Sequence, residues 1–183
     1  VMAEYSQGGK RLHMCYSFNL LTDKADPGYL HETLTEMEAR IGDGWPCWAL
    51  GNHDVTRLAT RWQAEGQLDK LRLCLVFLFS QRGSVCLYQG EELGLENVDD
   101  LPAELRQDPI FFRTNGEALG RDGCRVPLPW TASGSSFGFG SGGAHLPQPK
   151  WFADYAVEVE EKKSDSPLAI YRKALALRKE LQT

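Results

Sequence analysis

The amino-acid sequence predicts an α/β protein built on a parallel sheet. Three short apolar runs have the length of buried strands, and the segments between them carry apolar residues at helical spacing. Each run leads into polar or turn-forming residues, as strands of such a sheet do. Strands that alternate with helices in this way indicate repeated β-α units.

The strands and helices follow one another along the chain. Strands are expected at residues 11–21 (RLHMCYSFNLL), 45–50 (WPCWAL) and 84–88 (SVCLY). Residues 28–41 and 66–79 carry apolar side chains at three- and four-residue spacing, which predicts two amphipathic helices. We expect the first helix to end at the glycines that follow residue 41.

A last helix is expected at residues 167–181. Ser166 and Pro167 suit a capped first turn, because a serine side chain accepts from free backbone N–H groups and proline is tolerated there. Apolar side chains recur along the segment. Those expected to point inward are Leu168, Tyr171, Leu175 and Leu177.

Residues 91–164 break this rhythm. A loop of that length inside a compact domain is usually functional or disordered. The Gly/Ser-rich residues 133–143 leave a flexible linker open as an alternative. Residues 120–130 (GRDGCRVPLPW) carry too much apolar area and too many prolines for a linker. We therefore expect residues 91–164 to form a long active-site loop region.

Composition and charge exclude several classes of protein. The 183 residues are 42% hydrophobic and 25% charged, as in a globular domain. The net charge of -5 comes without the basic stripe that binds nucleic acid. The longest apolar stretch, residues 73–79, is far below the roughly 20 residues of a membrane span. We expect no nucleic-acid partner, no membrane span and no secretory signal, and the first residue, Val1, suggests that upstream residues are missing.

The five cysteines stand singly, without a Cys-x-x-Cys pair or a cluster with histidines. This pattern favours buried free thiols over a metal site or a disulfide framework. Free thiols persist in reducing compartments, so we expect a cytoplasmic protein.

The candidate site follows the second strand. Asn52, His53 and Asp54 come directly after residues 45–50, and active sites of parallel α/β proteins form at the carboxyl ends of strands. A histidine can exchange hydrogen bonds with a sugar hydroxyl, and a carboxylate can stabilise positive charge in a transition state. Taken alone, the tripeptide is also typical of an ordinary turn.

Four segments, in chain order, resemble glycoside hydrolase family 13, the α-amylase family, in its α-glucosidase and oligo-1,6-glucosidase branch. WALGNHDVTRLATRW at 48–62 looks like the fourth signature region, and SVCLYQGEELGLEN at 84–97 looks like the eighth barrel strand. GRDGCRVPLPW resembles the loop after that strand, and residues 11–21 are similar to the sixth strand. The resemblance implies a partial (β/α)8 TIM barrel, about strands six to eight with their helices and a long loop after strand eight.

The resemblance also implies roles for particular residues. Family members run a retaining reaction on terminal α-linked glucose with an aspartate nucleophile, a glutamate acid/base and a further aspartate. Asp54 matches the further aspartate, which binds sugar hydroxyls and helps distort the ring, and we expect it to be ionised. For the loop arginines the alternative is a salt bridge that only holds the loop. The implied substrate-binding residues are His53, Arg121, Arg125, Asn52 and Arg57.

Four further side chains have competing interpretations. The resemblance favours structural roles for Glu91 and Glu92 at the end of the third strand. Phe137 and Phe139 could form an aromatic wall for a second sugar, because sugar rings offer C–H faces to aromatic rings. Packing within the loop is the favoured alternative for both.

The nucleophile and the acid/base are expected upstream of Val1. No Gly-x-Arg-x-Asp sequence occurs here. We expect residues 1–183 to be the C-terminal portion of the barrel domain, without the N-terminal half-barrel and the β-sandwich domain, and to be inactive and aggregation-prone alone. The implied reaction releases terminal glucose from small oligosaccharides or α-glucosides without a cofactor. The alternatives are a transglucosylase of the same family and a non-catalytic barrel relative that acts as a binding module.

Overall fold

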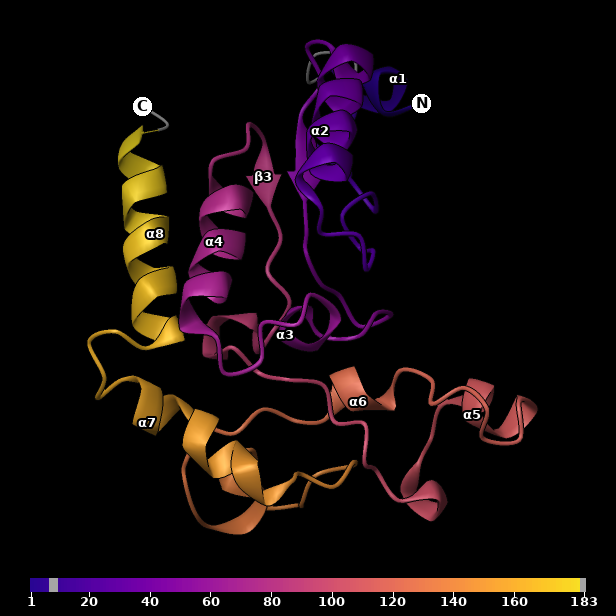
Figure 1. Cartoon of the computed structure of the whole chain (residues 1–183), viewed down its shortest axis with the longest axis vertical. Helices are drawn as coiled ribbons and strands as arrows, with labels where there is room; N and C mark the ends of the chain where they lie inside the picture. Colours follow the sequence, from indigo (N-terminus) through magenta and orange to yellow (C-terminus); the bar gives the residue numbers. More distant parts are fainter. Residues whose placement is uncertain (7–9, 182–183) are drawn as a thin grey trace.

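The sheet is parallel, as the sequence predicts. A computed structural model describes residues 1–6 and 10–181 (Figure 1). Its three strands lie in the order β1 (Cys15–Tyr16), β2 (Pro46–Trp48) and β3 (Ser84–Val85). Residue 15 pairs with residue 46, and residue 47 pairs with residue 84. The strands are shorter than the apolar runs, because only two or three residues of each run form backbone hydrogen bonds with a neighbouring strand.

Helices connect the strands and extend beyond them. The helix at residues 27–41 joins β1 to β2, and the helix at residues 68–79 joins β2 to β3 (Figure 1). The helix at residues 167–181 packs against the helix at residues 68–79. The α-helices are α1 (Met2–Ser6), α2 (Pro27–Ile41), α3 (Leu58–Arg61), α4 (Leu68–Phe79), α5 (Pro109–Arg113), α6 (Asp122–Arg125), α7 (Val157–Glu160) and α8 (Pro167–Leu181), and the 3-10 helices are η2 (Glu91–Leu93), η3 (Ala103–Leu105), η4 (Ser135–Gly138) and η5 (Lys150–Tyr155).

Local signals set both ends of α2; its end at Gly42 agrees with the expectation, and its start at Pro27 lies one residue before the expected start at residue 28. The Asp26 carboxylate accepts from the Tyr29 backbone N–H at 2.8 Å, which satisfies one of the free donors of the first turn. Pro27 occupies that turn, where its missing N–H costs nothing. Gly42 ends the helix at a φ of 54°, a value that glycine adopts without strain.

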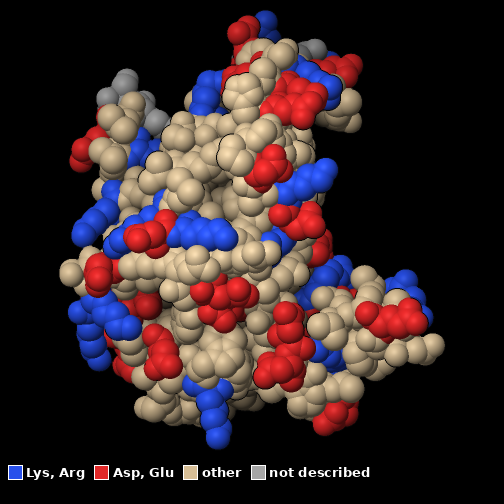
Figure 2. Space-filling view, viewed as in Figure 1, with Lys and Arg blue, Asp and Glu red and all other residues tan. Residues whose placement is uncertain are grey.

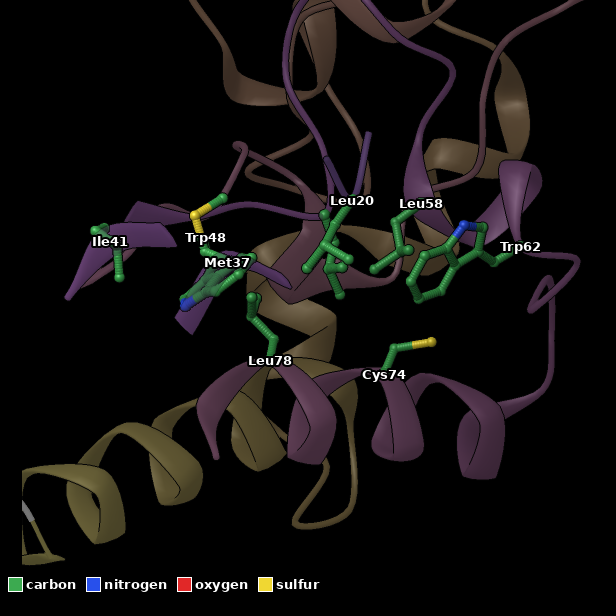
Figure 3. Close-up of a cluster of buried hydrophobic side chains, with 9 residues drawn as sticks. Leu20, Met37, Ile41, Trp48, Leu58, Trp62, Cys74 and Leu78 are labelled. Carbon is green, nitrogen blue, oxygen red and sulfur yellow. The ribbon is translucent and has the colours of Figure 1, made fainter. Parts of the chain in front are cut away.

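The main core lies between the sheet and the helices. Trp48 of β2 is 1% exposed, and Leu78 of α4 is fully buried beneath it (Figure 3). Burial of such side chains stabilises the fold by roughly 1.5 to 3 kcal/mol each. The cluster consists of Leu20, Met37, Ile41, Trp48, Leu50, Leu58, Trp62, Cys74 and Leu78.

The inward face of α8 differs from the expectation in its second half. Leu168 and Tyr171 are buried, but Leu175 is 45% exposed and Leu177 is 54% exposed. Ile170 and Ala174 pack against the cluster that contains Tyr171 instead. Arg178 donates to the carbonyl groups of residues 79, 81 and 83, so its side chain, and not Leu175 or Leu177, contacts the segment between α4 and β3.

Residues 91–164 have a core of their own and are not a linker. They lie beyond the carboxyl ends of the strands (Figure 1). Even the Gly/Ser-rich part folds back, since the N–H groups of Trp130 and Thr131 both donate to the Phe137 carbonyl, at 2.8 and 2.9 Å. The second core consists of Leu93, Leu95, Val98, Leu101, Val126, Leu128, Leu146, Phe152 and Leu168.

The surface and the thiols agree with the sequence only in part. Basic and acidic side chains are interspersed on the face in Figure 2, without a basic stripe. All five cysteines are free; Cys47, Cys74 and Cys124 are buried, Cys15 is half-buried and Cys86 is exposed. The expectation of five buried thiols is therefore wrong for Cys86, which follows the outer strand β3.

None of the described helices is long and apolar enough to cross a membrane.

Candidate active site

The candidate site begins where β2 ends. The chain turns at His53 and Asp54, and the Asn52 side chain accepts from the Asp54 backbone N–H at 2.8 Å. Such a turn holds the two residues that follow Asn52 in a fixed direction. The His53 and Asp54 side chains are 66% and 46% exposed, so both are accessible to a ligand.

Asp54 is surrounded by cationic and polar side chains from distant parts of the chain. Arg121 Nη1 donates to Asp54 Oδ1 at 2.9 Å, and Arg125 Nη2 donates to the same oxygen at 3.0 Å. His53 Nε2 lies 3.5 Å from Oδ2. The hydrogen bond from Arg121 is the main cause that lowers the Asp54 pKa below its usual range, and the charges of His53 and the two arginines act in the same direction. The structure thus keeps Asp54 ionised.

Arg125 also fixes the backbone of the site. Its Nε donates to the His53 carbonyl at 2.8 Å while its Nη2 binds Asp54. The planar guanidinium can hold both contacts only in one orientation. The structure therefore brings together four of the predicted residues in direct contact, His53, Asp54, Arg121 and Arg125, with Asn52 supporting the turn beneath them.

Arg57 is the predicted residue that the structure places elsewhere. Its side chain is 2% exposed, and Nη1 donates to the Gln89 carbonyl at 2.7 Å. The guanidinium lies 5.4 Å from the centre of the Tyr88 ring. Contact with a substrate needs exposed surface, so the expectation of a substrate-binding Arg57 is wrong in this structure. Its position between the ends of β2 and β3 gives it a packing role.

Glu91 binds the backbone of the segment that follows β3. It is buried, and its Oε2 accepts from the Tyr88 backbone N–H at 3.3 Å. Burial raises the pKa of Glu91 to about 8. Its Oε1 occupies the place where a side chain on Gly51 would begin, which explains why only glycine fits there. These contacts agree with a structural interpretation of Glu91.

Arg61 ties the turn to the rest of the sheet. Its Nε donates to the Thr22 carbonyl at 2.9 Å and its Nη1 to the Thr56 carbonyl at 2.6 Å, and Nη2 donates to the Leu50 carbonyl. Arg61 thus connects the segment after β1 with the segment after β2, which carries the candidate site.

Asp108 is a residue of the candidate site that the sequence does not mark. Its carboxylate accepts from Arg121 Nε at 2.6 Å, and its side chain has no exposed area. The pattern Asp108-Pro109 does signal a helix start, and Asp108 caps α5 through the Ile110 N–H at 3.0 Å. No sequence signal pairs it with Arg121, because the contact depends on how residues 109–120 fold back.

A cleft of about 280 Å³ adjoins this group. Asp54, Arg121 and Asn97 are among the residues that line it. A larger cavity of about 450 Å³, near Tyr155 and Lys163, lies apart from these side chains. We place the site at the smaller cleft, because convergent polar groups identify a binding site better than volume does.

Three other expectations concern aromatic and metal-binding groups. Phe137 packs against the second core and Phe139 is 48% exposed, and neither lines the cleft beside Asp54. Packing within the loop thus accounts for Phe137. Within residues 1–6 and 10–181, no three His, Cys, Asp or Glu side chains are grouped as metal ligands.

Comparison with known proteins adds a family to this geometry. Residues 6–183 match the family described as the alpha amylase catalytic domain. The chain is 40% identical over 183 residues to the probable alpha-glucosidase of Rhizobium meliloti (strain 1021), with 98% of this chain and 33% of that protein covered. It is 25% identical to the oligo-1,6-glucosidase of Parageobacillus thermoglucosidasius, with 93% and 36% covered. Among solved structures, the alpha-glucosyl transfer enzyme XgtA has a TM-score of 0.89 and 44% identity, with 98% and 33% covered.

The three parallel strands with their helices form part of an α/β barrel of the kind found in the matched catalytic-domain family, and the carboxylate and arginines lie at the strand ends. The chain belongs to the α-amylase family, glycoside hydrolase family 13, as the resemblance predicted. It spans about a third of the length of the relatives that it matches.

Proposed function

We propose that this chain supplies the glucose-binding half of a retaining α-glucosidase active site, from about strands six to eight of the barrel. The substrate class is a small oligosaccharide or α-glucoside with a terminal α-linked glucose. The observation that carries the proposal is the ionised Asp54, which two arginines and His53 hold at the carboxyl end of β2. The names of the relatives in the comparisons support the same reaction class.

Asp54 would act on the sugar rather than on the glycosidic bond. Its free lone pairs accept hydrogen bonds from glucose hydroxyls, and its negative charge stabilises the oxocarbenium-like transition state. The arginines keep the carboxylate deprotonated and aimed, so little reorganisation is needed as charge develops. The proposal assigns the nucleophile and the acid/base to parts of the enzyme outside these 183 residues. No cofactor is required, because carboxyl groups carry out every step.

His53 would bind the same glucose ring. Its side chain is largely exposed beside Asp54, and its imidazole can donate to or accept from a hydroxyl. Arg125 holds the His53 carbonyl and therefore fixes the direction in which the imidazole leaves the backbone. A hydroxyl contact that strengthens in the transition state would raise kcat.

The test is Asp54→Asn in the full-length enzyme that contains this chain. We expect kcat/KM for an aryl α-glucoside to fall about 10²- to 10³-fold, as when a preorganised charge contact is removed. Asp69→Asn is the matched control, because Asp69 is 94% exposed and pairs with the neighbouring Arg72. Equal activity of the two variants would exclude the proposed role of Asp54.

A transglucosylase is the second candidate. The specific observation in its favour is the alpha-glucosyl transfer enzyme XgtA, at 44% identity and a TM-score of 0.89. Hydrolysis and transfer share one glycosyl-enzyme intermediate and differ in whether water or a hydroxyl attacks it. Product analysis with an added alcohol acceptor decides between them. Mostly glucosylated acceptor indicates a transglucosylase, and mostly free glucose indicates an α-glucosidase.

We also propose a cytoplasmic location. Five free cysteines in one chain suit a reducing compartment, where disulfides are rare. Fractionation of the source cells with detection of the protein in each fraction tests this directly.

A further inference from the structure

Asp108 is a buried carboxylate directly behind the candidate site. Its Oδ2 accepts from both the Nε and the backbone N–H of Arg121, at 2.6 and 2.9 Å, and its Oδ1 accepts from the Ile110 N–H at 3.0 Å. The Arg121 guanidinium holds the pKa of Asp108 well below its usual range. The buried charge is therefore paired and hydrogen-bonded, as a charge without solvent must be.

A second carboxylate fixes the backbone that carries Asp108. Asp122 Oδ2 accepts from the N–H groups of Gln107 and Asp108, at 2.8 and 3.0 Å. Arg106 holds the neighbouring segments together, because it donates to the Leu119 carbonyl at 3.0 Å and to the Asp99 carbonyl at 2.6 Å. Residues 106–108 and 119–122 are thus held side by side, while residues 109–118 extend outward as an arm that includes α5 (Figure 1).

This arrangement fixes the direction of Arg121. A guanidinium is planar, so a bond at Nε sets the directions of both terminal nitrogen atoms. With Nε on Asp108, Nη1 reaches Asp54 Oδ1 at 2.9 Å. The Arg121 side chain is 35% exposed, and without Asp108 it would have many other conformations.

We propose that Asp108 is a positioning residue for the reaction, which acts on Asp54 through Arg121 and does not touch the sugar. This inference rests on the proposed function of Asp54. A series of hydrogen bonds runs from Asp122 to the Asp108 backbone, from the Asp108 carboxylate to Arg121, and from Arg121 to Asp54. It connects the base of the arm to the glucose-binding carboxylate. The loop after strand eight therefore orients the catalytic aspartate that follows the preceding strand.

A double-mutant cycle in the full-length enzyme tests this role. Asp108→Asn removes the charge and keeps the shape, and Arg121→Gln removes the group through which Asp108 acts. We expect Asp108→Asn to lower kcat/KM about 10- to 100-fold in the parent enzyme, the scale of a small misplacement. In the Arg121→Gln background, Asp108→Asn should change kcat/KM less than about twofold, because the effects of two coupled residues do not add in free energy. Losses that multiply in the double variant overturn the proposal.

The pH profile supplies a readout that a purely structural role would not move. If Arg121 is released, the Asp54 pKa rises toward its ordinary value, because the Arg121 hydrogen bond is the main cause of the lowering. The acid limb of kcat/KM should therefore move to higher pH in Asp108→Asn. Asp108→Glu keeps the charge and should restore part of both effects. Asp100→Asn, at an exposed position of the same region, is the matched control.

A second variant tests the idea without changing any charge. Gly120 has a φ of 73°, and a Cβ atom there would lie 2.9 Å from the Asp108 Cβ. Gly120→Ala should push Asp108 away from Arg121 and give the same loss, again only when Arg121 is present. If neither Asp108→Asn nor Gly120→Ala folds, as judged by thermal unfolding, Asp108 is a folding residue and the proposal fails.

Asp54→Asn separates this inference from the proposed function. If Asp54→Asn leaves kcat/KM unchanged, the proposed function fails and the positioning role fails with it. If Asp54→Asn inactivates the enzyme while the Asp108 and Arg121 losses multiply, only the positioning role fails.

Discussion

Arg125 donates from Nη2 to Oδ1 of Asp54 at 3.0 Å, although 71 residues separate the two in the sequence. The contact joins the turn after β2 to the short helix α6 in the region beyond β3. A carboxylate at a strand end would otherwise be free to rotate in solvent. Residues 91–164 therefore supply direct contacts to the carboxylate of the candidate site.

The first prediction concerns this contact. Arg125→Lys keeps the charge but loses the planar group that binds Asp54 and the His53 carbonyl together. We expect kcat/KM in the full-length enzyme to fall about 10-fold or more, since misplaced groups lose rate steeply. Arg172→Lys, at an exposed pair with Glu161, is the matched control and should keep full activity. Indistinguishable kinetics for the two variants would show that the Arg125 geometry is not needed.

Glu91 gives a prediction for stability against pH. Its folded-state pKa is raised to about 8, above the ordinary value of 4.5, so between these limits the folded protein holds a proton that the unfolded chain releases. Stability from this group therefore falls as pH rises through the window. Glu91→Gln should be more stable than the parent enzyme at pH 8 and nearly equal at about pH 4, in urea unfolding. Glu161→Gln, at a half-exposed side chain, should show no such difference.

Strands, helices and the core of the barrel portion follow from the sequence because they depend on local patterns. Apolar spacing identified α2, α4 and α8, and the expected Ser166-Pro167 start of α8 agrees with the Ser166 hydroxyl that accepts from the Ala169 N–H. The Asp26 cap of α2 was not predicted. The inward face of α8 was wrong beyond Tyr171, since apolar spacing does not reveal that Arg178 takes the contact with the sheet end. Long charged side chains can bury their stems while their head groups bind carbonyl groups.

The candidate site was predictable only where a motif marks it. Asn52, His53 and Asp54 follow a strand, so position and chemistry point to them together. Asp108 and Asp122 carry no such mark, because their contacts form between residues brought together by the fold of the arm. Arg57 was predicted as a site residue because the family pattern includes it. In the structure it is buried near the strand ends and does not line the cleft.

Asp108 gives the opposite pH dependence from Glu91. Its folded-state pKa is held well below the unfolded value of about 4, so its contribution to stability is fully present above that value and is lost as pH falls further. Between pH 6 and pH 3, Asp108→Asn should lose less stability than the parent enzyme, although it starts from a lower value. Parallel curves of unfolding free energy against pH for the two proteins would contradict the buried ion pair with Arg121.

The last prediction concerns the 183 residues expressed alone. In the described sheet, β1 and β3 each have one unpaired edge, and such edges pair with other chains. The outer helices also expose apolar side chains, of which Leu73 and Val76 on α4 are 68% and 62% exposed. We expect an inactive, aggregating protein in light scattering after size-exclusion chromatography. A monodisperse monomer with a cooperative thermal transition would contradict this expectation.

A variant identifies the cause of that aggregation. Leu73→Lys with Val76→Glu makes the exposed face of α4 polar and leaves both sheet edges unchanged. A large gain of monomer would assign the association to the apolar helix face, which fits burial of apolar area as its driving force. Unchanged aggregation would assign it to the edges of β1 and β3, because backbone N–H and C=O groups that lack partners in this sheet remain available to a second chain.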